Sequence, residues 1–476
     1  MLLIKEKRSM LFGLDKKITS MLRKKGLDEI LLSACKKNNE RKIKSLIFWG
    51  ANVNIRNECG ESLLQIVHNN GNINMLKYLL EHGADINMQY NTGATVLFEA
   101  CRKNDTKLAQ YLIDKIINSN NNKIFFISEL EIKDINGNTP LFMAINNKNK
   151  KLVKCLIRYG ANVNTKNCND NTALFISIYS GDLNIMKYLI GNGAKTKVVN
   201  NNGSTPLIYA STLGKEDIVE FLLKNYESSK NKRNFDGNTA LMCACLNGDK
   251  NIVELLLEND VNINIRNKEG KTALIQVCEQ CNNDIAKLLI EYGANIYIED
   301  FYKRTALSIS IVNKNIKMVK YLLEKGVDIN RYDSKGITPL MYACRSGEMS
   351  IVSLLIEKGA YIDTIDKNGR SALMYAIKYG YAEIFLYLIK KGANVNIVDF
   401  NGVSTLMYAV EKNHIGIVEY LIKRGVNLNK TDFMGETALK KSYKYGFHDI
   451  SNLLEKRKAI DIVNELESKK IYFLLD

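Results

Sequence analysis

The side chains that could perform chemistry are few and scattered along the chain. The histidines are His68, His82, His414 and His448. No two of them are spaced as metal ligands would be. Cys278 and Cys281 form a C-x-x-C pair, but zinc or redox chemistry would need a second pair or a nearby histidine. Because phosphate-loop, G-x-S-x-G and H-E-x-x-H motifs are also missing from the sequence, we expect no enzyme, no cofactor and no metal.

Two other sets of potentially reactive residues recur at regular intervals, which indicates a structural role. Cys278 shares its position with Cys35, Cys101, Cys245 and Cys344, each directly after a small residue. A free cysteine behaves there as a small apolar packing residue. The recurring aspartates are Asp134, Asp300, Asp333, Asp366, Asp399 and Asp432. They resemble an acidic ladder, but each stands at the start of a turn, so we interpret them as turn residues.

Composition favours one long array over several globular domains. The chain has 476 residues, 46% of them hydrophobic, and only 3 prolines, with no long glycine- or serine-rich linker. The first 26 residues are interrupted by charges and lack the apolar run of a signal peptide. No window approaches about 18 uncharged apolar residues, so we expect no membrane span. Ten cysteines without a disulfide framework favour an intracellular, cytoplasmic protein.

The net charge of +16 has two interpretations. It could attract nucleic acid or an acidic partner. The excess is mostly lysine, however, and accompanies abundant Asn, Ile and Tyr, as an A/T-rich genome would produce. We favour this second interpretation, which disfavours nucleic acid; the most concentrated basic patch is Lys16 to Lys37.

The element that positions these residues is a repeat of 33 residues. Its opening positions are Gly60, Gly93, Gly137, Asp170, Gly203, Gly237, Gly270, Lys303, Gly336, Gly369, Gly402 and Gly435. A further unit lies upstream, around Leu31 and Gly50, which gives about thirteen units. The clearest copy, from Asp333 to Asp363, predicts a turn, a helix, a second turn, a second helix and a glycine stop.

Each recurring position has a physical reason. A hydroxyl two residues after the opening position, such as Thr338, can cap the first helix, and the chain's three prolines follow such residues. Leu340 and Ala343 then share one helix face. Gly359 ends the second helix in a left-handed conformation. A recurring Asn, as at Asn54 and Asn330, is expected to tolerate left-handed dihedrals and to bond locally in the turn.

These residues resemble the ankyrin repeat. The pattern appears as GNTPLFMA at 137–144 with GANVN at 160–164, and the resemblance covers about 27 to 460. It implies an all-α repeat solenoid of about thirteen stacked helix-turn-helix units with β-hairpin-like tips and a concave binding face. The family's usual histidine is replaced by Phe or Met at 98, 142, 175, 242, 341, 374 and 407. We expect packing to replace its polar network.

We divide the chain into an N-terminal helical cap (1–26), units one to three (27–136) with an insertion near 114–132, units four to six (137–236) with an irregular end near 225–235, units seven to thirteen (237–457), and a C-terminal cap helix and tail (458–476). The insertion contains a polar, loop-like run from Asn118 to Asn122 and then apolar residues from Ile124. It is either a loop tucked over its neighbour or a protruding contact loop. We expect Phe48 and Trp49 to pack on the N-terminal segment or on a partner.

In the family, partners bind residues that flank the opening glycine and residues at the end of the first helix. The resemblance carries this role to a set of aromatic and cationic residues in the last five units. They are Phe301, Tyr302, Arg304, Arg345, Arg370, Lys378, Tyr379, Phe400, Phe433 and Tyr445. Arg and aromatic residues dominate interface hot spots, whereas the same positions in units four to six are mostly Asn. For Phe400 and Phe433, packing between neighbouring tips remains an equal alternative.

We therefore expect a monomeric, non-catalytic protein-interaction scaffold or adaptor that binds an acidic or amphipathic protein segment. A second hypothesis is a pathogen or viral effector that links a host target to degradation or signalling. A third is binding of nucleic acid or another acidic surface through the basic net charge.

Overall fold

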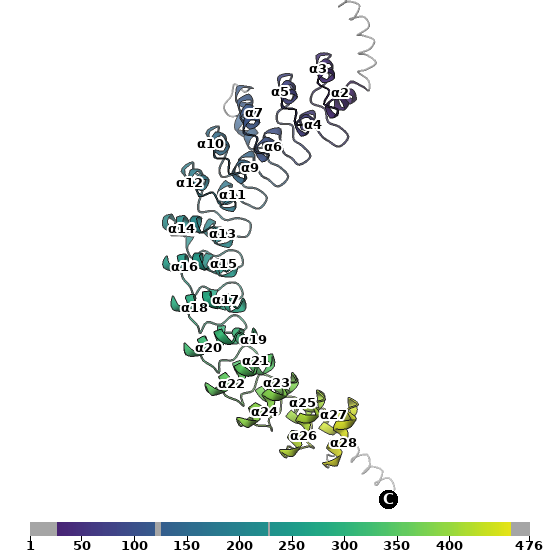
Figure 1. The fold of residues 1–476 in the computed structure, drawn as a ribbon, viewed down its shortest axis with the longest axis vertical. Helices are drawn as coiled ribbons and strands as arrows, with labels where there is room; N and C mark the ends of the chain where they lie inside the picture. Colours follow the sequence, from purple (N-terminus) through teal and green to yellow (C-terminus); the bar gives the residue numbers. More distant parts are fainter. Residues whose placement is uncertain (1–25, 120–124, 227–228, 458–476) are drawn as a thin grey trace, which may run out of the picture. The chain divides into compact units, whose positions relative to one another are not determined.

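The structure, a computed structural model, describes residues 26–119, 125–226 and 229–457 (Figure 1). The chain divides into two compact units at Ser229 and Lys230. This division falls where the sequence lacks a glycine stop, after the last helix turn at Asn225. Residues 1–25 of the expected N-terminal cap (1–26) and the whole expected C-terminal cap (458–476) lie outside the described residues.

The first unit is built from helix pairs, one pair for each repeat. Its helices are α2 (Leu27–Lys36), α3 (Glu40–Phe48), α4 (Leu63–Asn69), α5 (Ile73–Glu81), α6 (Val96–Arg102), α7 (Thr106–Ser119), α8 (Phe125–Leu130), α9 (Pro140–Asn146), α10 (Lys150–Arg158), α11 (Ala173–Ser180), α12 (Leu183–Gly191), α13 (Pro206–Thr212) and α14 (Glu216–Asn225). The first helix of each pair packs against the first helices of its neighbours, as α9 does between α6 and α11.

The second unit repeats this arrangement without an inserted helix. Its helices are α15 (Ala240–Asn247), α16 (Lys250–Glu258), α17 (Ala273–Glu279), α18 (Asn283–Glu291), α19 (Ala306–Val312), α20 (Ile316–Glu324), α21 (Pro339–Ser346), α22 (Met349–Glu357), α23 (Ala372–Lys378), α24 (Ala382–Lys390), α25 (Thr405–Glu411), α26 (Ile415–Lys423), α27 (Ala438–Lys444) and α28 (His448–Lys456). In Figure 1 the loops that join repeats extend from the side of the first helices. The all-α repeat fold is confirmed, and in the described ranges β-structure is limited to isolated bridges such as Ile365–Ser371.

The repeat from Asp333 to Asp363 shows why these short helices form. Thr338 caps α21 by accepting a hydrogen bond from the backbone N–H of Met341 at 3.3 Å. Pro339 occupies the first turn, as predicted. The same cap forms at every predicted hydroxyl except Thr139 and Thr172, whose hydroxyls have no partner among the described residues. Leu340, Ala343 and Leu355 are buried, so the pair closes around an apolar core.

The opening glycine has two constraints. Gly369 has φ +80°, and a Cβ there would lie 2.6 Å from the backbone nitrogen of Phe400 in the next tip. That nitrogen donates a 2.8 Å hydrogen bond to the carbonyl of Asn368, so neighbouring tips are joined through their backbones. Where the glycine is replaced, Asp170 and Lys303 still adopt φ values of 56° and 58°. This position therefore requires a left-handed backbone conformation and favours glycine, which has no side chain to clash with the next tip.

The recurring asparagines act differently from the prediction. None of those predicted has a positive φ. Asn54 and Asn330 instead accept, at 2.7 and 2.8 Å, the backbone N–H of the residue 31 positions later, Asp85 and Tyr361. The prediction that these side chains bond locally in the turn was wrong, because they tie one repeat to the next.

The Phe and Met residues named below, which stand where the family usually has a histidine, are buried. Phe142, Phe175 and Met341 are each fully buried. The sulfur of Met341 lies 3.5 Å from the backbone nitrogen of Thr338 and accepts its N–H, and Met407 does the same for Ser404. These side chains thus contribute apolar packing, and Met341 and Met407 add a weak hydrogen bond through sulfur.

The insertion in the first unit is partly helical. Helix α7 continues to Ser119, so the expected loop does not begin at Asn118, and α8 packs against α7. Ile116 and Leu130 are buried. Glu131 accepts hydrogen bonds from the backbone of Asn162 at 2.8 Å and from the hydroxyl of Thr165 at 2.5 Å. Both described flanks of the insertion therefore pack onto the repeats, whereas 120–124 lie outside the described residues.

The second helices carry a lysine–aromatic contact that recurs between repeats. Lys77 lies 4.6 Å from the ring centroid of Tyr111, and Lys287 lies 5.5 Å from that of Tyr321. Each pair is separated by 34 residues and joins adjacent second helices. These cation–π contacts hold many aromatic side chains in place. By contrast, Phe48 and Trp49 contact each other edge to face and remain 82% and 42% exposed.

Candidate functional site

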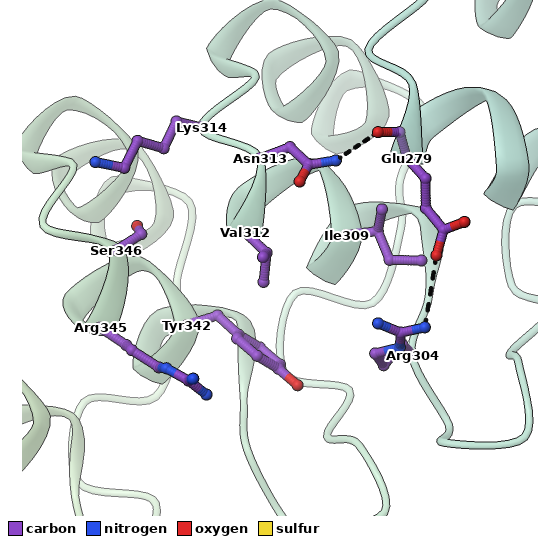
Figure 2. A pocket seen from close by; sticks show the side chains of 9 residues that line it. All are labelled: Glu279, Arg304, Ile309, Val312, Asn313, Lys314, Tyr342, Arg345 and Ser346. Atoms are coloured by element: carbon purple, nitrogen blue, oxygen red, sulfur yellow. Dashed lines mark hydrogen bonds and ion pairs between the residues drawn. The ribbon is translucent and has the colours of Figure 1, made fainter.

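A hollow in the second unit lies at the ends of the first helices. Its volume is about 480 Å³ (Figure 2). It is lined by Glu279, Arg304, Ile309, Val312, Asn313, Lys314, Tyr342, Arg345 and Ser346. These residues come from the end of α17, from α19 and the turn after it, from α21, and from the tip before α19. Two residues predicted from the sequence, Arg304 and Arg345, thus lie on its wall.

Arg304 is already held by two acids. Its guanidinium lies 2.7 Å from the Asp300 carboxylate and 3.5 Å from that of Glu279. Burial acts to lower the pKa of Arg304, but the hydrogen bond to Asp300 and the charges of both acids outweigh it and raise the pKa. The ring of Tyr302 lies 5.4 Å away. Arg304 therefore shapes the wall, with much of its charge neutralised.

Arg345 belongs to a cluster that we call the Tyr379 cluster: Arg345 and Tyr379, which are exposed, and Lys378, which is half-buried. The charged ends of Arg345 and Lys378 lie 5.8 and 5.9 Å from the centroid of the Tyr379 ring. That ring is 40% exposed and stacks parallel to Tyr375 at 6.4 Å. Within the described residues, neither cation makes an ion pair with an acid. The cluster therefore combines positive charge with aromatic surface.

Beneath this surface is a set of hydrogen bonds that the sequence did not reveal. The hydroxyls of Tyr342, Tyr375 and Tyr408 donate to Asp333, Asp366 and Asp399 at 2.6, 2.8 and 2.8 Å. In each pair the tyrosine follows the aspartate by nine residues, and this spacing was the signal that could have revealed them. Burial and the hydrogen-bonded carboxylates raise the pKa values of all three tyrosines. The aspartates therefore join each tip to its own first helix.

Arg370 belongs to these hydrogen bonds more than to the exposed surface. Its Nε donates to the Tyr408 hydroxyl at 3.1 Å, and the residue is half-buried. Its pKa is raised: burial acts to lower it, but the neighbouring Tyr408 and Asp366 outweigh burial. Among the predicted site residues, Arg370 therefore has a structural contact that the Tyr379 cluster lacks.

The predicted aromatic residues of the tips are exposed. Phe301, Tyr302, Phe400 and Phe433 are 65%, 63%, 59% and 80% exposed. An edge of the Phe301 ring and an edge of the Phe400 ring lie over the opening glycine of the preceding tip. Arg266 lies 5.2 Å from the Phe301 centroid. Packing between tips thus fixes two of these rings without covering them.

Tyr445 is separate from these groups. It lies in the last described repeat, 46% exposed, and its ring stacks on Phe447 at 5.8 Å. The structure thus brings Arg345, Lys378 and Tyr379 together and places Arg304 and Arg345 on one hollow. Phe301, Tyr302, Phe400 and Phe433 lie on the tips.

The described residues offer no arrangement for metal chemistry. No group of three His, Cys, Asp or Glu side chains there could hold a metal ion. Cys278 is buried, and burial raises its pKa to about 12, so the thiol stays protonated at neutral pH. Cys281, its C-x-x-C partner, is free and exposed. The structure therefore favours a packing role for Cys278.

Comparisons with known proteins agree with this geometry. Two family models match: "Ankyrin repeats (3 copies)" covers 31–124, 116–200, 180–267, 259–333 and 330–399, and "Ankyrin repeats (many copies)" covers 392–441. A comparison with curated proteins finds no match. No helix in the described ranges is long and apolar enough to cross a membrane. Ankyrin repeats generally serve as protein–protein interaction modules. Since the matches span most of the sequence, the chain belongs to the ankyrin-repeat family.

Proposed function

We propose that this protein is a non-catalytic interaction scaffold that captures a protein segment on the second unit, with the Tyr379 cluster at the centre of the contact. The observation that carries this proposal is the placement of Arg345 and Lys378 over one exposed tyrosine ring. Arginine and tyrosine are the residue types enriched at interface hot spots. Rings and cations held against each other lose little side-chain entropy when a partner binds.

The charge of the cluster favours an acidic or amphipathic segment. Arg345 and Lys378 make no ion pair within the described part of the chain, so a partner carboxylate could approach both without displacing an acid. Lys367, in the tip of the repeat that contains Tyr379, is also exposed. The exposed rings of Phe400 and Phe433 add apolar surface on the tips. An amphipathic segment would engage both kinds of group.

The experiment compares capture by three forms of the full chain. The site variant replaces Arg345, Lys378 and Tyr379 with Ala. The control variant replaces Lys287, Tyr321 and Lys325 with Ala; these residues form a similar two-cation cluster around one tyrosine on the second helices. Both variants lose two positive charges and one tyrosine.

Each form is immobilised and used to enrich proteins, and each enriched protein is then purified and titrated against all three forms. We expect binding to survive in the control variant and to fall in the site variant. A partner that binds the wild type and the site variant equally would refute the proposed surface.

A further inference from the structure

We propose that the hollow between α19 and α21 receives one acidic side chain of the bound segment, together with an adjacent aliphatic side chain. This inference rests on the proposed function, because it assigns the chemistry of a subsite beside the Tyr379 cluster. At about 480 Å³, the hollow lies within the roughly 300–1,000 Å³ typical of ligand pockets, so it has room for more than one side chain.

The hollow lies at a repeat that lacks a ring present in the three repeats that follow it. Ile309 occupies the position that is Tyr342, Tyr375 and Tyr408 in the next three repeats. Asp300, nine residues before Ile309, consequently has no tyrosine hydroxyl and is bound by Arg304 at 2.7 Å. A tyrosine ring is thus replaced by a smaller aliphatic side chain on the floor and by an arginine on the wall.

The two walls differ in charge. Figure 2 shows Lys314, Ser346 and Arg345 along one side. Glu279 and Arg304 lie along the other side and are paired with each other (Figure 2). Among the residues that the structure describes, Lys314 and Arg345 have no acidic partner. The unpaired positive charge of the hollow therefore lies on the first wall.

Between the walls the surface is apolar. Val312 is 49% exposed, and Figure 2 shows its side chain between those of Arg345 and Ile309. Burial of an aliphatic group on Val312 would remove apolar area from water. A carboxylate at Arg345 and Lys314 would form charge-assisted hydrogen bonds beside it. This combination fits Asp or Glu next to Leu, Ile or Val in one protein segment.

A carboxylate fits better than a phosphate. The opposite wall carries the carboxylate of Glu279, and Arg304 is already shared between Glu279 and Asp300. A group with a charge near −2 would be repelled by these acids more strongly than a carboxylate with charge −1. Arg345 and Lys314 are the two cations of the hollow without an ion pair among the described residues. Arg345 can bind a carboxylate through two parallel hydrogen bonds.

Ile309→Tyr tests this assignment because the repeat pattern supports the new ring. The added side chain would fill the hollow as Tyr342, Tyr375 and Tyr408 fill their own repeats. Lys314→Glu reverses a wall charge without altering the Tyr379 cluster. Cys243→Tyr is the matched control: it adds a ring at the same repeat position two repeats earlier, at a buried residue outside the hollow. Circular dichroism checks that each variant keeps the helical fold.

The probe is a displayed library of random linear peptides, selected on the wild-type full chain. We expect the selected peptides to share an Asp or Glu beside an aliphatic residue. Their affinity should fall by about tenfold or more with Ile309→Tyr and with Lys314→Glu, and should persist with Cys243→Tyr.

The other outcomes separate this inference from the proposed function. One outcome would overturn this inference alone. In it, the selected peptides share no acidic residue and bind the Ile309→Tyr variant as well as the wild type, but lose affinity for the Tyr379-cluster variant. Peptides indifferent to both sets of substitutions, or a selection that enriches nothing, would overturn both. Tighter binding after the acid is replaced by phosphoserine would overturn the carboxylate assignment.

Discussion

The Tyr342 hydroxyl donates a 2.6 Å hydrogen bond to the Asp333 carboxylate and so joins helix α21 to the tip that precedes it. Both groups are buried. The other oxygen of Asp333 accepts the backbone N–H groups of Lys335 and Ile337, each at 2.8 Å. One carboxylate thus organises both the turn and its attachment to the helix.

Removing this hydroxyl should destabilise the second unit. Tyr342→Phe would leave one Asp333 oxygen without its donor, and hydrogen bonds to charged groups contribute about 1.5–3 kcal/mol. We expect a loss of this size in urea unfolding and faster amide hydrogen exchange in α21. Tyr361→Phe is the control, because Tyr361 is 68% exposed. Equal stability of the two variants would show that the buried bond contributes little.

The last described repeat uses the same nine-residue spacing with a different donor. Lys441, buried in α27, lies 2.9 Å from both Asp432 and Glu411. Lys441→Met would leave these acids without their cation, which typically costs about 3–5 kcal/mol for a buried pair. We expect accelerated hydrogen exchange in α27 and α28. Lys440→Met, at a half-buried neighbour, serves as the control.

The same pair predicts acid sensitivity. Burial acts to raise the pKa of Asp432, but the hydrogen bond and charge of Lys441 outweigh it and lower the pKa. The stabilisation is therefore complete above the ordinary aspartate pKa of about 3.9 and is lost as pH falls through the lower folded value. Hydrogen exchange in α27 should quicken over that range. Unchanged α27 exchange there would contradict this contribution.

Two glycines with the same backbone conformation, one in a tip and one after a second helix, should respond to substitution according to their neighbours. Gly369 and Gly326 both have φ +80°, but a Cβ lies 2.6 Å from the Phe400 nitrogen at the first and meets nothing within 4 Å at the second. Gly326→Ala should cost about 1–2 kcal/mol from its left-handed conformation alone. Gly369→Ala should cost about 1–3 kcal/mol more through the clash. Comparable urea-unfolding free energies for the two variants would contradict close approach of the tips.

A buried histidine should make the first unit sensitive to mild acid. Burial and the charge of Lys103 lower the pKa of His68, with Glu99 opposing. Below about pH 6.5 the unfolded chain binds a proton that the folded chain resists, so stability should fall as pH falls from there through the lower folded pKa. Hydrogen exchange in α4 should reveal this loss. His68→Gln should abolish the effect, whereas His82→Gln, at an exposed residue, should retain it.

Much of the fold could be predicted because the repeat places the same backbone requirement at every copy. Gly336, Thr338, Pro339 and Gly359 each have a local reason, and the structure places them as those reasons require. The role of Asn54 was predicted wrongly, because its side-chain oxygen accepts the backbone N–H of Asp85 in the next repeat and not one in its own turn.

The site was harder to predict because it depends on contacts between repeats. Arg370 and Arg345 were both predicted to bind the partner, but the Tyr408 hydroxyl accepts a hydrogen bond from the first and Tyr379 lies beneath the second. The hollow is lined in part by Ile309, a residue with no chemistry of its own. Only comparison with Tyr342 at the same repeat position gives this residue meaning.

Binding of the partner by the Tyr379 cluster can be measured with purified proteins. The most direct measurement is the dissociation constant of one captured and purified protein for the wild type, for the Arg345, Lys378 and Tyr379 variant, and for the Lys287, Tyr321 and Lys325 control. Loss of a hot spot costs about 2 kcal/mol or more, so affinity for the site variant should fall by roughly 30-fold or more, with the control near wild type. Equal affinity of all three forms would contradict the claim.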